Sequence, residues 1–563
     1  MGYSGQVCFG QAGFVAVGAY ATAFLVKNGL SYWVSLPIGG IVAALAGLMI
    51  GIPAIRIRGH YLALATMSFA YIIHLILVHW ESVTGGPRGL IAARPLWPIS
   101  FEKEKYFYFV IFFIVIALFI VARNIVRSKY GRAFLAIQKD EIVSKSMGIN
   151  LTIYKTLAFI VCSFYAGIAG GLYGPLIGFL DPLSFTILDS ALYIMMIVLG
   201  GRGTLFGAFI GAAFFAILPE VLREAKKWQE FSFGIIFICF LIFMPHGVMG
   251  FIKKYQYFFA GQSRRVRFLR YLFVERQSME ENLLASNTLP IQKFPSGIGK
   301  RSGNGLLQVS NLSITFGGLQ ALNKVSFNIQ EGQIFSLIGP NGAGKTTALN
   351  VITRLYEADD GKIIFSGEEL LKIGADKIVS KRISRTFQNV GLFPGLSALE
   401  NVMVGLHSSG GAGFFSSALK LKGSMEDEAR KRIQALEVLK LVHLEDQAHQ
   451  VATDLPFGQQ KLVGLARALV SKPLLLILDE PASGLSSLEV EQLMDLTRRL
   501  RDEKGTTILL VEHDMRVVMG ISNRIAVLNF GEKIAEGDPE EIRNNPLVVE
   551  AYLGEEEETG QAC

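Results

Sequence analysis

The 563-residue sequence is short of charged residues and of cysteines. Asp, Glu, Lys and Arg make up 18% of it, against about 25% in a typical soluble protein, whereas hydrophobic residues make up 51%. This shortage of charge excludes a wholly soluble protein, and it predicts that part of the chain lies in a lipid bilayer. Four scattered cysteines exclude a disulfide framework, and their spacing is not that of a metal-ligand cluster.

The formal net charge is +7 because 54 Lys and Arg residues outnumber 47 Asp and Glu residues. A basic balance is found in nucleic-acid-binding proteins, but Lys and Arg also collect in the cytoplasmic loops of membrane proteins. The apolar composition favours the second explanation. We therefore expect a lipid bilayer and no nucleic acid among the partners of this chain.

Eight apolar segments in the first half predict an all-α polytopic membrane domain. Several reach the roughly 20 residues that a helix needs to cross a bilayer. They cover residues 9–26, 32–55, 61–79, 106–122, 156–178, 187–199, 204–219 and 231–249. The basic stretch 123–155 is expected on the cytoplasmic side, and a short helix from Gly131 is expected within it. His74 alone is ionisable near the middle of a segment, which predicts an apolar or backbone-lined pathway rather than a proton relay.

A glycine-rich stretch in the second half predicts a nucleotide site. It follows the apolar run 334–338 and precedes the helix-compatible run 348–352. A strand, a glycine-rich loop and a helix in this order form a P-loop, whose backbone N–H groups and helix dipole hold phosphates. The residues are Gly339, Pro340, Asn341, Gly342, Ala343, Gly344, Lys345, Thr346 and Thr347. Lys345 is expected to reach the outer phosphates, and the Thr346 hydroxyl to bind Mg²⁺.

Four polar side chains further along fit the same chemistry. An apolar run ends in Asp479, which suits Mg²⁺ through water, and in Glu480, which can polarise an attacking water. His513 follows another apolar run and is a candidate for contacting the γ-phosphate, while Gln388 can touch both Mg²⁺ and the water. Solvent-capped acids at a strand end are the alternative explanation for the first two.

Two further segments point to one class of ATPase. Phe316, before two glycines, is a candidate for stacking on adenine, although an isolated Phe is more often part of a core. The sequence Leu-Pro-Phe-Gly-Gln-Gln at 455–460 resembles the ABC ATPase signature, and with it about 306–553 resembles an ABC ATPase. The resemblance implies an α/β P-loop fold, with ATP and Mg²⁺ as cofactors. It also implies pairing with a second ATPase domain, whose bound ATP would contact Leu455, Gly458 and Gln459 of this chain.

The signature departs from the family pattern. Pro456 and Phe457 stand where the family has Ser and Gly, and Ser486 stands where it has Asp. Proline offers neither a hydroxyl nor an N–H group to a phosphate. We expect the site at this chain's own P-loop to hydrolyse ATP. We expect less efficient hydrolysis at the partner's P-loop, where this chain supplies the altered signature.

The resemblance narrows further to the Liv-type transporters of branched-chain amino acids. It is carried by 2–7, 10–12, 18–20, 56–63, 84–87 and 146–150 for the permease and by 315–319 and 549–554 for the ATPase. It implies a permease fused to its ATPase, with a membrane domain at 1–255, a linker at 256–303, an ATP-binding domain at 304–554 and an acidic tail at 555–563. The family pattern has one more apolar helix before Gly2, so we expect a truncated chain or a start codon assigned late.

The function implied is ATP-driven import of branched-chain amino acids across the cell inner membrane, with the ATPase domain in the cytoplasm. The expected partners are an external solute-binding protein and a second permease and ATPase, or a second copy of this chain. One alternative keeps the mechanism and changes the cargo to urea, short amides or other amino acids. Another is a membrane-tethered ATPase that gates or signals without pumping.

Overall fold

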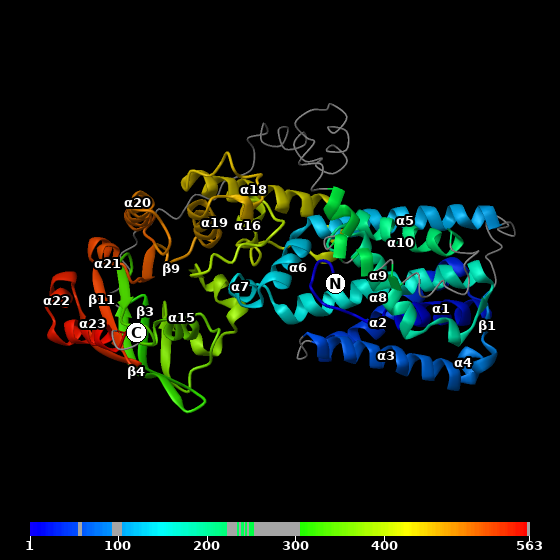
Figure 1. The fold of residues 1–563 in the computed structure, drawn as a ribbon, viewed down its shortest axis with the longest axis horizontal. Coiled ribbons are helices and arrows are strands. Elements are labelled where there is room, and N and C mark those ends of the chain that lie inside the picture. The colour runs from blue at the N-terminus through cyan, green and yellow to red at the C-terminus, as the bar shows by residue number, and fades with distance from the viewer. Residues whose placement is uncertain are drawn as a thin grey trace. The chain divides into compact units, whose positions relative to one another are not determined.

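The computed structural model describes residues 1–54, 59–92, 104–221 and 305–559, with short stretches between 234 and 252. By their internal contacts these residues form two units (Figure 1). Described residues within Met1–Gln138, Leu151–Asn287 and Phe414–Lys420 form the first unit, and those within Lys139–Asn150, Thr288–Gly413 and Leu421–Cys563 form the second. Each unit therefore contains a short segment from the opposite half of the sequence.

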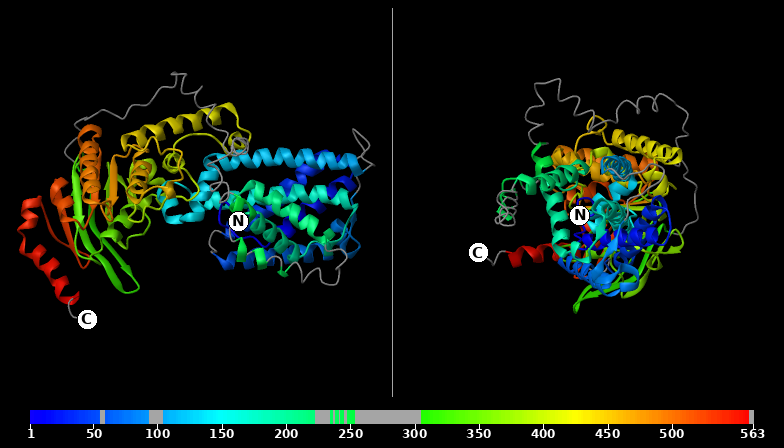
Figure 2. Two further views of the ribbon diagram at one scale, coloured as in Figure 1. Left: turned by 45° about the horizontal axis from the view of Figure 1, so that its top comes forward. Right: turned by 90° about the vertical axis from the view of Figure 1, so that its right-hand side faces the viewer.

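The first unit is helical, and its long helices run alongside one another (Figure 2). Its helices are α1 (Gln11–Lys27), α2 (Tyr32–Ala54), α3 (His60–His79), α4 (Glu81–Thr84), α5 (Glu104–Arg127), α6 (Lys129–Lys139), α8 (Leu151–Ile177), α9 (Ile187–Gly200), α10 (Leu205–Val221) and α17 (Phe414–Ala418). Strands β1 (Leu90–Ile91) and β2 (Phe179–Leu180) pair antiparallel. These helices confirm the predicted all-α class for this part of the chain.

Five helical segments in the described part of the chain are long and apolar enough to cross a membrane: Tyr32–Pro53, Tyr61–His79, Tyr106–Arg127, Leu151–Ile177 and Pro182–Gly200. Two further apolar helices, α1 and α10, are shorter. The predicted segment 231–249 lies partly outside the described residues, and the predicted linker 256–303 lies wholly outside them. The basic stretch after 122 is largely helical, because α5 continues to Arg127 and α6 follows at once.

Glycines allow the central helices of this unit to approach closely. A Cβ atom on Gly18 of α1 would lie 2.2 Å from the Gly167 carbonyl oxygen of α8, and one on Gly170 would lie 1.9 Å from the Val15 carbonyl oxygen. Both distances are far shorter than any real contact, so no side chain fits between these backbones. Small residues have this role in membrane helix pairs, where packing rather than water exclusion drives association.

The second unit is built on a mixed six-stranded sheet in the order β12-β11-β5-β10-β9-β8. Its strands are β5 (Ile334–Ile338), β8 (Ile383–Arg385), β9 (Leu475–Asp479), β10 (Thr507–Val511), β11 (Arg524–Asn529) and β12 (Glu532–Gly537). All neighbours are parallel except β11 and β12. Strands β5, β9 and β10 are buried at every residue, as expected when both faces of a parallel sheet are covered.

A four-stranded antiparallel sheet lies in the same unit, in the order β4-β3-β6-β7. It consists of β3 (Leu307–Phe316), β4 (Leu319–Ile329), β6 (Asp360–Phe365) and β7 (Glu368–Glu369). The helices are α7 (Glu141–Ser146), α15 (Lys345–Ile352), α16 (Ala398–Val404), α18 (Lys422–Leu441), α19 (Phe457–Leu469), α20 (Ser487–Lys504), α21 (Met515–Ile521), α22 (Pro539–Arg543) and α23 (Pro546–Thr559). This arrangement confirms the predicted α/β P-loop class.

Two apolar clusters stabilise the second unit. One packs α15 between the strands of both sheets, and the other packs α16, α18, α19 and α20 against β9 and β10. Because β5, β9 and β10 are parallel, their carboxyl ends lie at the same edge of the sheet, where α/β proteins place their ligands. The P-loop, Asp479 with Glu480, and His513 lie at or just beyond the carboxyl ends of these three strands, and Gln388 follows the neighbouring strand β8.

Gly18→Val should destabilise the first unit, because the added side chain would enter the α8 backbone. Overpacking typically costs about 1–3 kcal/mol. We expect a lower midpoint temperature when the full chain is heated in detergent and the monodisperse fraction is followed by size-exclusion chromatography. Gly234→Val is the matched control, since no atom of the described residues lies within 4 Å of its added Cβ. Equal midpoints for the two variants would contradict the close helix contact.

Candidate nucleotide-binding site

The predicted P-loop joins the buried strand β5 to helix α15. Gly339, Gly342 and Gly344 have φ values of +148°, +79° and +95°, a backbone region that favours glycine. A Cβ on Gly339 would lie 2.0 Å from the Leu528 carbonyl oxygen, so the loop also requires glycine for space. The Lys345 ammonium is buried and donates hydrogen bonds of 2.7 Å to the Gly339 and Pro340 carbonyl oxygens.

This loop has the chemistry that a triphosphate requires. It ends at the N-terminus of α15, where the helix dipole is positive, and it carries a cation and the Thr346 hydroxyl. Among the described residues no three His, Cys, Asp or Glu side chains gather as a metal cluster. Mg²⁺ seldom needs such a cluster, since it commonly takes one or two carboxylates and the oxygens of phosphates and water. The residues present therefore fit a Mg²⁺–nucleotide rather than a metal held by the protein alone.

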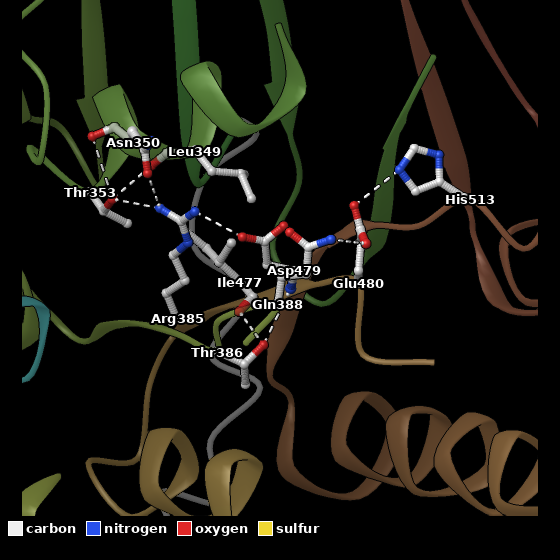
Figure 3. Close-up of polar contacts among 10 residues, drawn as sticks. All are labelled: Leu349, Asn350, Thr353, Arg385, Thr386, Gln388, Ile477, Asp479, Glu480 and His513. Carbon is white, nitrogen blue, oxygen red and sulfur yellow. Dashed lines mark hydrogen bonds and ion pairs between the residues drawn. The ribbon is translucent and has the colours of Figure 1, made fainter. Parts of the chain in front are cut away.

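Asp479, at the end of β9, is held by a buried ion pair. Its Oδ2 atom lies 2.8 Å from Arg385 Nη2, and the two side chains are 6% and 3% exposed. Arg385 Nη1 also donates to Asn350 Oδ1 at 2.7 Å and to Thr353 Oγ1 at 3.3 Å (Figure 3). One guanidinium therefore connects the P-loop helix α15 to strands β8 and β9.

Three of the predicted residues meet at the Glu480 carboxylate (Figure 3). Its Oε2 atom accepts a 2.6 Å hydrogen bond from Gln388 Nε2, and its Oε1 atom lies 3.0 Å from His513 Nε2. Glu480 has a φ of +46°, a left-handed conformation that costs a non-glycine residue about 1–3 kcal/mol and therefore depends on the surrounding structure. Its N–H group donates to the Val511 carbonyl oxygen at 2.8 Å, which ties it to β10.

Phe316 ends β3 and is 43% exposed. Its ring makes an edge contact with Tyr356, with centroids 5.2 Å apart. The ring is accessible to a ligand, and its stacking on adenine stays a prediction.

The signature segment begins helix α19. Pro456 is the N-cap residue and provides no side-chain cap, while Phe457 is 51% exposed. A Cβ on Gly458 would lie 2.0 Å from Glu489 Oε1, so this glycine packs directly against the start of α20. Ser486, at the position where the family has Asp, caps α20 together with Glu489 in a reciprocal capping box. Contact of Leu455, Gly458 and Gln459 with a partner's ATP stays a prediction.

Two charged residues that the sequence did not indicate, Lys461 and Glu512, lie beside the backbone that follows Glu480. Burial raises the pKa of the Glu512 carboxyl, although three backbone N–H groups and Lys461 oppose this shift. Burial lowers the pKa of the Lys461 ammonium, and the negative charges of Glu512 and Glu480 oppose this shift. Each charge therefore opposes, without cancelling, the effect of burial on the other group's pKa.

Known families match three parts of the chain. Residues 1–244 match the family described as branched-chain amino acid transport system / permease component, residues 322–483 match the ABC transporter family, and residues 532–558 match the branched-chain amino acid ATP-binding cassette transporter family. The first match falls mostly in the first unit, and the other two fall mostly in the second unit. No single one of these matches extends across the whole chain.

Individual relatives agree with this division. The second half is 43% identical over 250 residues to the high-affinity branched-chain amino acid transport ATP-binding protein BraF of Pseudomonas aeruginosa, covering 44% of this chain and 98% of BraF. It is 42% identical over 250 residues to LivG of Escherichia coli K12, with the same coverage. The first half is 30% identical over 290 residues to the permease protein LivM of Salmonella typhimurium, covering 47% of this chain and 68% of LivM.

Arg385→Met should strongly destabilise the second unit, because Asp479 would remain buried without its cationic partner. Breaking a buried pair in this way costs about 3–5 kcal/mol. We would measure the unfolding transition of the full chain in detergent by calorimetry, and identify the transition of the second unit by its shift with Mg²⁺ and ATP. Lys372→Met is the control, because its ion pair with Glu369 is exposed and should leave that transition nearly unchanged. Equal shifts of this unfolding transition in the two variants would contradict a stabilising role for the Arg385–Asp479 ion pair.

Proposed function

The chain belongs to the family of branched-chain amino acid ABC transporters, and from this premise we propose that it imports branched-chain amino acids. It is a membrane protein in which a permease and an ATP-binding ABC ATPase are fused, and its ATP hydrolysis is coupled to transport. The direction of transport, the cargo and the subunit composition belong to the proposal. The convergence of Gln388 and His513 on Glu480 supports the hydrolytic part of it most directly.

In the proposed mechanism, ATP lies along the P-loop residues 339–347. Lys345 would turn from the loop carbonyls to the outer phosphates, and Thr346, Gln388 and Asp479 would hold Mg²⁺, directly or through water. When bound, Mg²⁺ neutralises charge on the phosphate oxygens. Arg385 keeps the Asp479 carboxylate at the end of β9, where it faces this part of the site.

Glu480 is the proposed general base for the attacking water. Its carboxylate would exchange the Gln388 and His513 contacts for the water, with Gln388 and His513 remaining close enough to orient that water and the γ-phosphate. A carboxylate in this position removes a proton as the oxygen attacks phosphorus. Phe316 is proposed to stack on the adenine ring.

The proposed assembly contains a second permease and a second ATPase, or a second copy of this chain, and an external solute-binding protein. It lies in the inner membrane with the ATPase in the cytoplasm. Residues 139–150 belong to the ATPase-containing unit, and Asn150 there donates to Asp376 Oδ2 at 2.9 Å. This membership supports the proposal that the segment 131–150 passes the motion of the ATPase to the helices.

Glu480→Gln should lower ATP hydrolysis by about 10²-fold or more, because the amide cannot accept the proton from water. ATP affinity should stay within about threefold, because the P-loop is unchanged. Turnover and binding would be measured on the purified full chain in liposomes. Glu503→Gln, in an exposed residue near the end of α20, is the matched control. Undiminished turnover of the Glu480 variant, in a preparation without another competent ATPase site, would refute the proposed base.

Uptake into vesicles tests the direction and the cargo. With binding protein outside and ATP inside, labelled leucine should accumulate above its outside concentration, and Glu480→Gln should abolish the accumulation. Isoleucine and valine should compete with leucine, whereas urea and acetamide should not. Uptake that only equilibrates would favour a gated pathway, and competition by urea or acetamide would favour the alternative cargo.

A further inference from the structure

The turn after Glu480, residues 481–486, is held on one side by a single ammonium group. Lys461 of α19 places its Nζ atom 3.1 Å from the Glu480 carbonyl oxygen and 3.0 Å from the Pro481 carbonyl oxygen. The same atom donates to the Ser483 carbonyl oxygen. Three carbonyl oxygens within four residues therefore converge on one cation. Charge-assisted hydrogen bonds of this kind are about twice as strong as neutral ones.

The buried Glu512 carboxylate holds an N–H group of the same turn. Its Oε1 atom accepts a 2.5 Å hydrogen bond from the Ala482 N–H group, and its Oε2 atom accepts a 3.0 Å bond from the His513 N–H group. The side chain is only 3% exposed. Lys461 thus binds carbonyl groups of the turn, and Glu512 binds one of its N–H groups. Glu512 also accepts a hydrogen bond from the backbone of His513, whose ring contacts Glu480.

The aromatic ring of Phe457 completes this packing. The Lys461 ammonium lies 5.6 Å from the ring centroid, within the range of a cation–π contact. Gly484 has a φ of +76°, and a Cβ there would lie 2.9 Å from a ring carbon of Phe457. The turn therefore lies close against the first turn of α19. This gives Phe457, which departs from the signature pattern, a contact within its own chain.

We propose that Lys461 and Glu512 are positioning residues for ATP hydrolysis, which fix the turn 481–486 and thereby hold Glu480 in its left-handed conformation. The inference rests on the proposed role of Glu480 as the base. The turn begins at the peptide group of Glu480, so a displacement of its carbonyl oxygens rotates the backbone that sets the direction of the carboxylate. Since Lys461 belongs to α19, the position of the signature helix and the position of the hydrolytic carboxylate depend on each other.

Lys461→Met tests the proposal, because it keeps an unbranched apolar side chain of similar length and removes the three donated hydrogen bonds. In the full chain in liposomes we expect kcat to fall between about 10-fold and 100-fold, the size of effect that small misplacements of catalytic groups produce. The KM for ATP should stay within about threefold, since the P-loop is untouched. Glu512→Gln should lower kcat in the same way, and the double variant should be little worse than the more impaired single variant.

Lys431→Met is the matched control. Lys431 is a buried lysine of α18 that pairs with Asp427 at 3.1 Å, away from the turn. Its loss should lower the thermal midpoint and leave the kcat of the folded protein unchanged. A purely stabilising role for Lys461 predicts that Lys461→Met behaves like this control. Lys461→Arg keeps the charge and should lose less activity than Lys461→Met.

Hydrogen exchange measured by mass spectrometry gives a readout independent of turnover. In Lys461→Met the peptide covering residues 480–486 should exchange about tenfold faster or more, while peptides from β10 and the middle of α20 stay unchanged. Wild-type exchange in that peptide, or wild-type kcat, would overturn the proposal. If Glu480→Gln retains turnover, the base assignment fails instead, while faster exchange in Lys461→Met would still show that Lys461 holds the turn.

Discussion

The ion pair between Arg385 and Asp479 is buried at the centre of the ATPase unit, and its two charges are costly to remove from water unless their geometry is good. Arg385 also donates to Asn350 and Thr353, so its charge is shared among three acceptors, although its buried Nε group has no hydrogen-bond partner among the described residues. This guanidinium thereby joins three elements: the P-loop helix α15, the strand β9 that ends in Asp479, and the strand β8 that leads to Gln388. The positions of Lys345, Asp479 and Gln388 all depend on this arrangement.

The Glu480 carboxylate, the proposed base, is held by a different set of contacts. Glu480 stands just beyond the end of β9 in a left-handed conformation that hydrogen bonds from outside the strand must compensate. The side chains that contact it, Gln388 and His513, come from two other segments. Asp479, a proposed Mg²⁺ ligand, thus depends on a buried ion pair, whereas Glu480, the proposed base, depends on contacts with neighbouring segments.

Sequence patterns located the parts of this site whose signals are local. The P-loop, the two acids at the end of β9 and His513 each lie at the end of an apolar run, and these runs form buried strands. Arg385 carried a weaker signal, a charged residue at the end of the short buried strand β8, three positions before Gln388. Lys461 and Glu512 carried no sequence signal, because their roles depend on contacts with the turn 481–486 that form only in the folded chain. Helix ends were less predictable than helix positions: the apolar segment predicted at 106–122 forms α5, which continues to Arg127.

Each of the two units includes a segment encoded in the opposite half of the chain. In the helical unit, the Ala418 carbonyl oxygen accepts a 2.9 Å hydrogen bond from the Asn124 amide, and Phe414 makes an edge contact with the ring of Tyr130. In the ATPase unit, Asn150 binds Asp376. For a fused polypeptide this exchange has an evolutionary consequence. Joining the two genes makes both halves in equal numbers and turns their recognition into an intramolecular event, so mutations that weaken either exchanged segment are tolerated more readily than in a transporter assembled from separate proteins.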